Sequence, residues 1–177
     1  VLGYLPPMEE ASIPSRHLGL VTAAEIEHLS ARFDTIAAEL ERYADLSALL
    51  HLAADVPCPE PMEKQETRPA RCRIAVAMDQ AFSFYYQDNL DELEAAGAEL
   101  RYFSPLNDRV LPEADGLYLG GGYPELYLPR LTQNETMRES IRRAIENGMP
   151  TVAECGGFLY LQSSLKDENG TLWPMVG

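Results

Sequence analysis

Two hydrophobic patterns alternate along the chain from residue 73 onward. Short apolar runs bounded by glycine or charged residues predict buried strands, and apolar residues spaced three or four positions apart predict helices that face a core. We expect strands at 73–78, 99–103, 116–119 and 151–154, one helix that ends at Gly97, and another that Asn134 caps and Asn147-Gly148 ends.

This alternation predicts an α/β fold in which parallel strands form a sheet with helices on both faces. Ligands of such sheets bind beyond the carboxyl ends of the strands. Three polar or glycine-rich segments, after Met78, after Leu119 and after Glu154, begin at strand ends of this kind. We therefore expect the three segments to meet at one edge of the sheet and to form its site.

The part of the chain before residue 57 follows another pattern. A capping box from Thr22 to Glu25 precedes apolar residues at alternating steps of three and four, which predicts one long helix over residues 22–44. Asp45 is placed to cap a second helix that ends near residue 53. A short strand and two helices bury little surface, so we interpret residues 1–56 as the C-terminal remnant of a preceding domain.

Residues 57–72 contain four prolines and alternating charges, with almost no apolar period. Such a composition is typical of a linker or of a connection that crosses a surface. The predicted organisation is therefore a domain remnant at 1–56, a linker at 57–72 and an incomplete second domain at 73–177. Both ends of the chain read as cut from something larger.

Composition narrows the classes of partner. The 177 residues include 28 acidic and 14 basic side chains, and the net charge of −14 disfavours nucleic acid and anionic membranes. No apolar run approaches the roughly 18 residues of a membrane span, and no secretory signal is visible. The three cysteines, Cys58, Cys72 and Cys155, form no CxxC pair, which indicates a reducing, cytoplasmic location without a disulfide framework.

Cys155 lies where the last predicted strand gives way to a helix, in the run Ala153-Glu-Cys-Gly-Gly157. A strand, a cysteine, two glycines and an apolar helix form the pattern of a nucleophile elbow, which presents its side chain to substrate. The amino end of the new helix would favour the reactive thiolate. The alternative is a buried structural cysteine at a strand end.

Gly120-Gly-Gly-Tyr-Pro-Glu125 follows the third predicted strand. Three glycines leave backbone N–H groups unobstructed, and beside a cysteine nucleophile such groups would form an oxyanion hole. The alternative is a flexible turn. A phosphate-binding loop is disfavoured, because the segment has neither the GxxxxGK[ST] pattern nor a lysine.

An aromatic loop, Ala81-Phe-Ser-Phe-Tyr-Tyr86, follows the first strand. This loop either packs beneath the next helix or forms one wall of a site for a large flat substrate or a partner domain. The three histidines, His17, His28 and His51, all precede the linker. A cysteine nucleophile normally needs a base within hydrogen-bond reach, so the site is incomplete and we nominate no base.

Together these segments resemble the cobyrinic acid a,c-diamide synthase family, whose second domain is a class I, cobyrinate-type glutamine amidotransferase with a flavodoxin-like sheet. The resemblance covers nearly the whole chain, and Leu2-Gly-Tyr-Leu-Pro6 and Pro14-Ser-Arg-His-Leu-Gly-Leu20 resemble the end of the family's ATP-dependent, P-loop-type synthetase domain. The matching runs of the second domain are Arg73-Ile-Ala-Val-Ala, the aromatic loop, Phe103-Ser-Pro-Leu106, Asp115 to Glu125, and Ala153 to Gly157.

The resemblance implies a glutamine-hydrolysing enzyme of cobalamin biosynthesis that amidates the a and c carboxylates of cobyrinic or hydrogenobyrinic acid. Cys155 matches the family nucleophile. The implied partners are glutamine, a corrinoid acid and an upstream synthetase domain. The resemblance leaves open whether the protein forms a homodimer. The implied oxyanion and glutamine-binding residues are Gly121, Gly122, Tyr123, Glu125 and Gly156.

The resemblance also implies what this chain lacks. ATP and Mg²⁺ would be used by the full-length enzyme at sites before Val1, with no metal or cofactor bound to this fragment, and the catalytic histidine would follow Gly177. The isolated chain is therefore expected to have little or no glutaminase activity.

Other functions stay open at this stage. One is amidation of a different tetrapyrrole, as in nickel-sirohydrochlorin a,c-diamide synthase. Another is an ATP-independent cysteine hydrolase of similar fold, although the leftover helices before the linker do not fit it. A third is a non-catalytic interaction module in which Cys155 is inert.

Overall fold

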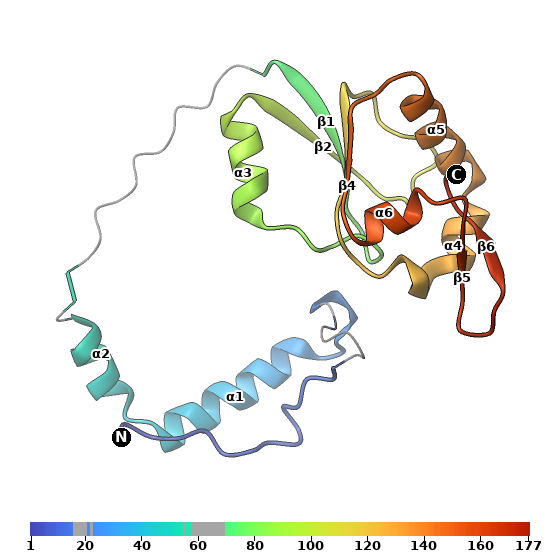
Figure 1. Ribbon diagram of the computed structural model, residues 1–177. Coiled ribbons are helices and arrows are strands. Elements are labelled where there is room, and N and C mark those ends of the chain that lie inside the picture. Colours follow the sequence, from blue (N-terminus) through green and yellow to red (C-terminus); the bar gives the residue numbers. More distant parts are fainter. Residues whose placement is uncertain (16–20, 22, 55, 58–69) are drawn as a thin grey trace. The chain divides into compact units, whose positions relative to one another are not determined.

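The computed structural model describes residues 1–15, 21, 23–54, 56–57 and 70–177 (Figure 1). The chain divides into two compact units, Val1–Glu63 and Lys64–Gly177. Most of the predicted linker lies outside the described residues, as does Thr22 of the predicted capping box. The domain limits of 1–56 and 73–177 stay a prediction.

The first unit consists of the 3-10 helix η1 (Ala23–Glu25) and the helices α1 (Leu29–Tyr43) and α2 (Leu46–Ala54). The prediction of one continuous helix from residue 22 was wrong, because His28 adopts a left-handed conformation with φ 55° and α1 begins only after it. The predicted cap of α2 is confirmed, since the Ala48 N–H donates to the Asp45 carboxylate at 2.9 Å. The predicted N-terminal strand is reduced to a single bridge between Gly3 and Ala44.

The second unit alternates strands and helices as the pattern predicts (Figure 1). The four expected strands and the two expected helices are confirmed within a few residues. The elements are β1 (Cys72–Ala77), α3 (Gln87–Ala95), β2 (Ala98–Phe103), β3 (Gly116–Leu119), η2 (Pro124–Tyr127), α4 (Leu128–Gln133), α5 (Glu135–Glu146), β4 (Thr151–Ala153), α6 (Gly156–Tyr160), β5 (Ser164–Lys166) and β6 (Leu172–Pro174).

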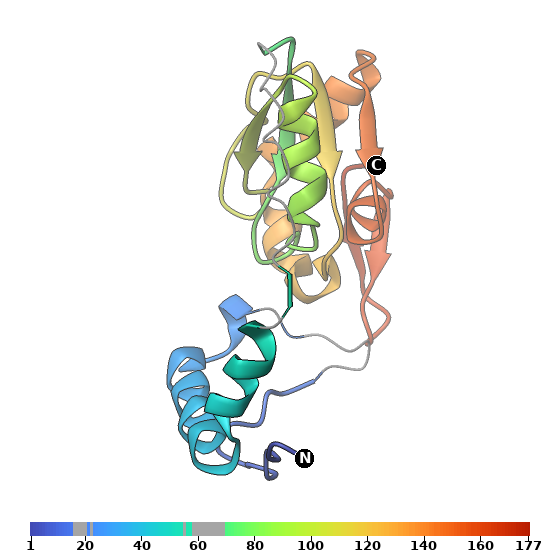
Figure 2. The same cartoon turned by 90° about the vertical axis from the view of Figure 1, so that its left-hand side faces the viewer.

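Four of the strands form one parallel sheet in the order β2-β1-β3-β4. This is the order of a flavodoxin-like doubly wound sheet, as the sequence predicted. Figures 1 and 2 show α3 on one face of the sheet and α4, α5 and α6 on the other. Among the described residues, no helix has the length and apolar character that crossing a membrane requires.

The core of this unit lies between the sheet and the α4–α6 layer. Apolar strand residues meet fully buried helix residues there, such as Leu131 of α4, Ile141 of α5 and Tyr160 of α6. Burial of this kind stabilises a fold by roughly 1.5–3 kcal/mol for each large apolar side chain. The second unit therefore has the packed layer that an α/β fold needs.

Two details of this unit depart from expectation. Asn134 lies at the N-terminus of α5, but its side chain makes no cap; its amide instead donates to the carbonyls of Pro105 and Asp108 at 2.8 and 2.7 Å. The hydrophobic pattern also did not predict the antiparallel hairpin of β5 and β6, two strands of three residues each.

Candidate active site

The three predicted segments do meet at the carboxyl edge of the sheet. The Gly157 N–H, in the first turn of α6, donates to the Gly120 carbonyl after β3 at 2.9 Å. Phe84, in the loop after β1, forms an isolated bridge with Gly121, and its N–H donates to the Gly121 carbonyl at 3.1 Å. The segments that follow β1, β3 and β4 thus lie together at this edge, as the sequence predicted.

Cys155 connects β4 to α6 in a strained conformation. Its backbone has φ 47° and ψ −111°, which residues other than glycine rarely adopt. The turn is held on both sides, because the Glu154 N–H donates to the Leu119 carbonyl at 2.9 Å and the Leu159 N–H donates to the Cys155 carbonyl at 3.0 Å. The thiol is free and exposed. A strained strand-to-helix turn that exposes its side chain is the geometry of a nucleophile elbow.

The two glycines after the cysteine are required by close backbone contacts. A Cβ at Gly156 would lie 2.7 Å from the Gly122 carbonyl oxygen, and a Cβ at Gly157 would overlap the Leu119 carbonyl. A side chain at Gly157 would therefore push α6 away from β3, and one at Gly156 would push it away from the glycine loop. The Gly-Gly pair lets the cysteine turn lie directly against the glycine loop.

Gly121 and Gly122 lie beside the cysteine from the other side. A Cβ at Gly121 would stand 3.7 Å from the Cys155 Cβ, whereas a Cβ at Gly122 would overlap the Ala81 carbonyl. The structure therefore brings Gly121, Gly122 and Gly156 together around Cys155. Their roles as oxyanion donors stay a prediction.

Tyr123 and Glu125 follow the glycines into η2. The Tyr123 ring packs edge-on against Phe84, with centroids 5.3 Å apart. Glu125 is exposed in the first turn of η2, and its link to the cysteine turn runs through Pro124, whose Cδ would lie 2.8 Å from a Cβ at Gly156. The structure thus places Tyr123 near the cysteine loop and leaves Glu125 at its surface.

Both interpretations of the aromatic loop apply, to different residues. Phe82 is fully buried against the Tyr160 ring, with centroids 5.3 Å apart, so it is packing. Phe84 lies half-buried against Gly121 and Tyr123, next to Cys155. The loop therefore anchors itself in the core through one aromatic residue and presents another at the site.

Asp79 also organises this edge, although it was not among the residues that the sequence pattern singled out. Its carboxylate accepts hydrogen bonds from the Ala81 N–H at 2.8 Å, the Ser104 hydroxyl at 2.8 Å and the Leu106 N–H at 2.9 Å. It thereby ties the aromatic loop to the loop after β2. An aspartate directly after a buried strand is the signal that could have identified it.

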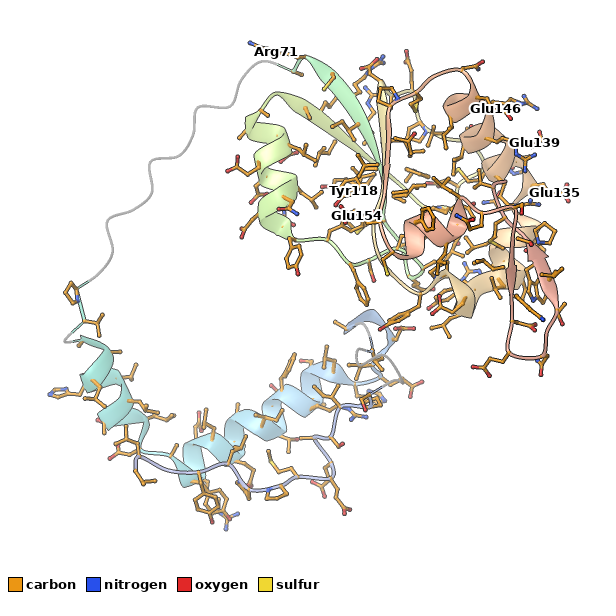
Figure 3. The ribbon with its side chains drawn as sticks, in the orientation of Figure 1. Arg71, Tyr118, Glu135, Glu139, Glu146 and Glu154 are labelled. Atoms are coloured by element: carbon orange, nitrogen blue, oxygen red, sulfur yellow. The ribbon has the colours of Figure 1, made fainter. Side chains whose placement is uncertain are left out.

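Tyrosine hydroxyls form a second set of contacts that the sequence did not reveal. The Tyr85 hydroxyl donates to the Ala77 carbonyl and accepts from the Gly120 N–H, and burial raises the pKa of Tyr85 far above its usual value. The Tyr118 hydroxyl faces the Glu154 carboxylate at 3.5 Å (Figure 3). Burial, with Glu154 nearby, also raises the pKa of Tyr118.

A groove of about 600 Å³ lies on the sheet face that α3 partly covers. Ile74, Leu93, Tyr118, Val152 and Glu154 are among its lining residues, and Cys155 is not. The groove therefore borders the cysteine turn through Glu154 without containing the thiol. The groove follows from the part of the sheet face that α3 leaves uncovered. The candidate site is therefore the strained turn at Cys155.

Metal chemistry finds no support in the described part of the chain. No three His, Cys, Asp or Glu side chains there are grouped so that they could hold a metal ion. The histidines also lie before residue 73 in the sequence. We therefore assign no described residue to Mg²⁺ and none as general base.

Comparison with known proteins agrees with this geometry. The family of CobB/CobQ-like glutamine amidotransferase domains matches residues 73–177, which is more than half of the chain. That range begins within β1 and includes the glycine loop and Cys155.

Curated relatives match the whole chain. It is 42% identical over 178 residues to the cobyrinate a,c-diamide synthase of Caldanaerobacter subterraneus subsp. tengcongensis, which covers 100% of this chain and 39% of that protein. It is 46% identical over 175 residues to the hydrogenobyrinate a,c-diamide synthase of Pseudomonas aeruginosa, covering 99% of this chain and 40% of the relative. The chain thus spans about two fifths of the length of these relatives, and it belongs to the family of CobB/CobQ-like glutamine amidotransferase domains.

Proposed function

We propose that Cys155 is the nucleophile of a glutaminase site that supplies ammonia for the amidation of the a and c carboxylates of cobyrinic or hydrogenobyrinic acid. The strained, exposed turn at Cys155 carries this proposal, because it lies in the matched amidotransferase region and has the geometry of a nucleophile elbow. The names of the two relatives support the corrinoid substrate.

The chemistry follows from the arrangement around the thiol. The Cys155 sulfur attacks the side-chain carboxamide carbon of glutamine, and the carbonyl oxygen becomes an oxyanion. We assign the backbone N–H groups of Gly122 and Gly156 to that oxygen, with Gly121 setting the loop against the cysteine. The C–N bond then breaks, ammonia leaves, and water hydrolyses the glutamyl thioester to glutamate and the free thiol.

The complete amidation needs ATP and Mg²⁺, for which we assign none of the described residues in this chain. ATP and Mg²⁺ would supply the activation of the corrinoid carboxylates, and the described residues include no cluster of ligands for a metal ion. We propose that residues 1–56 belong to the synthetase domain that holds them and that residues 73–177 form the amidotransferase part. Corrinoid amidation is thus a property of the longer protein in the cytoplasm.

We further propose that the 177 residues alone turn glutamine over slowly. A thiol nucleophile depends on a base within hydrogen-bond reach, and the sequence has no histidine after His51. Losing one partner of such a catalytic set typically reduces the rate by about 10³-fold or more. Covalent capture of the thiol by a glutamine analogue is therefore a better assay than ammonia release.

The test is labelling with 6-diazo-5-oxo-L-norleucine, in which the cysteine sulfur bonds to the diazo-bearing carbon and dinitrogen leaves. Intact mass and peptide mapping should place one adduct on Cys155, and free glutamine should block it. Cys155→Ser should abolish labelling. Cys72→Ser is the matched control. Cys72 is also free and exposed, but it lies at the amino end of β1, away from the carboxyl edge of the sheet.

A protein of the relatives' full length should be labelled faster and should release ammonia from glutamine. Labelling of Cys72 and Cys155 at equal rates, or labelling that glutamine does not block, would refute the glutaminase site. Glutaminase activity without amidation of either corrinoid acid would retain the nucleophile and refute the substrate.

A further inference from the structure

The Tyr85 side chain stands between two strands that carry the site. Its hydroxyl donates to the Ala77 carbonyl at the end of β1 at 2.5 Å and accepts from the Gly120 N–H, just after β3, at 2.7 Å. The side chain is half-buried, and its ring packs edge-on against Tyr118 at 5.2 Å between centroids. One hydroxyl thus satisfies two backbone groups from different strands.

These two backbone groups would otherwise bond to each other. The parallel register of β1 and β3 pairs Val76 with Tyr118. If the ladder of β1 and β3 continued beyond this last pair, its next hydrogen bond would run from the Gly120 N–H to the Ala77 carbonyl. The Tyr85 hydroxyl occupies that position instead, so the strands separate and the glycine loop begins at a distance set by the tyrosine.

Gly120 passes this constraint to the nucleophile. Its N–H is held by Tyr85, and its carbonyl accepts the Gly157 N–H at 2.9 Å in the turn that follows Cys155. The ring also requires glycine here, because a Cβ at Gly120 would overlap it. The path from the tyrosine hydroxyl to the cysteine turn therefore contains one residue, Gly120, and two hydrogen bonds.

We propose that Tyr85 is a positioning residue, which acts through Gly120 to set the distance between the glycine loop and Cys155. This inference rests on the proposed glutaminase function for its meaning and on the backbone hydrogen bonds for its geometry. Buried backbone groups that lose a partner cost free energy, so removal of the hydroxyl should let the loop shift. Misplacement of about 1 Å can slow a positioned reaction by about 100-fold.

The test is Tyr85→Phe, which keeps the ring and removes the hydroxyl. The matched control is Tyr86→Phe, because the neighbouring Tyr86 is 79% exposed. With 6-diazo-5-oxo-L-norleucine, we expect Tyr85→Phe to lower the maximal labelling rate of Cys155 about 10- to 100-fold, with little change in the half-saturating concentration. Alkylation by iodoacetamide, which needs an accessible thiolate but no bound glutamine analogue, should match the wild type.

A second measurement is independent of the glutaminase reaction. In ¹H–¹⁵N spectra, the amide signals of Gly120 and Gly157 should move, and their hydrogen exchange should accelerate, in Tyr85→Phe and not in Tyr86→Phe. In the wild type, the Gly120 amide should be protected although it lies beyond the ladder. This wild-type measurement stays decisive even where the phenylalanine variant does not fold.

Unprotected Gly120 in the wild type, or a labelling rate of Tyr85→Phe equal to that of Tyr86→Phe, would overturn the proposal. A lower melting temperature with unchanged labelling would also overturn it, since that is the result of a purely structural role. Failure of the wild type to be labelled would refute the proposed function, whereas the amide measurements would still decide whether Tyr85 sets the loop.

Discussion

The helices of the two units have similar hydrophobic patterns, but their apolar residues are exposed in the first unit and buried in the second. In the first unit, no residue of α1 or α2 is buried, and Phe33 and Leu50 are more than half exposed. In the second unit, α5 has a comparable stripe whose residues Met137 and Ile141 are completely buried. A periodic apolar face therefore predicts where a helix would pack, and it does not say that a packing partner is present.

The difference lies in what the sheet provides. The strands of the second unit present an apolar face on which α4, α5 and α6 all pack, so each stripe has a surface to bury against. Among the described residues of the first unit, the strand-like pairing is the isolated bridge between Gly3 and Ala44. This contrast agrees with the proposal that residues 1–56 belong to a larger synthetase domain.

Separating the units should produce the largest effect. A chain of residues 64–177 should unfold in one cooperative transition, because its core lies within that range. A chain of residues 1–63 should give a weak, gradual thermal change in circular dichroism, because short helices without burial are marginal in water. A sharp melting transition of residues 1–63 by themselves would break the comparison.

Matched leucine truncations should reproduce the contrast on a smaller scale. Leu131 of α4 is 0% exposed and Leu50 of α2 is 71% exposed. Leu131→Ala should lower the free energy of unfolding by about 2–5 kcal/mol, whereas Leu50→Ala should change it by less than about 0.5 kcal/mol. Urea unfolding of both variants would measure this, and equal losses would show that burial does not distinguish the units.

Within the second unit, two glycines should separate close packing from ordinary contact. Gly157→Ala should reduce stability by about 1–3 kcal/mol, because its Cβ would overlap the Leu119 carbonyl. Gly116→Ala should change stability by about 0.5 kcal/mol or less, since its Cβ would stand 3.6 Å from the Pro150 carbonyl oxygen. A neutral Gly157→Ala would mean that α6 can move away from β3 freely.

How far the sequence predicted this molecule depends on whether the determining contacts are local. The strands and the meeting of Gly120 with the Cys155 turn follow from hydrophobic period and parallel topology, whereas the flavodoxin-like sheet was implied by the family resemblance. The break at His28 and the role of Tyr85 do not, because each depends on a backbone conformation or a partner distant in sequence. Side-chain hydroxyls that replace ladder hydrogen bonds leave no periodic signal.

The smallest expected effect concerns pH and the hairpin of β5 and β6. The Asp167 carboxylate accepts hydrogen bonds from the Trp173 indole N–H at 2.9 Å and from the Thr171 N–H at 2.8 Å. These bonds, with the indole contact first, hold the pKa of Asp167 below its usual value. Because the folded pKa is the lower one, the stabilisation is present above the unfolded pKa of about 3.9 and is lost as pH falls through the folded pKa.

Trp173 is the single tryptophan of the sequence, so its fluorescence reports this contact and the second unit alone. Its emission should titrate with a midpoint below about 3.9 in the wild type, and that titration should vanish in Asp167→Asn. Melting followed by the same signal should give a lower midpoint for Asp167→Asn at pH 7 and a difference that shrinks toward pH 3. A difference that grows on acidification would reverse the sign and show that Asp167 stabilises the hairpin in its protonated form.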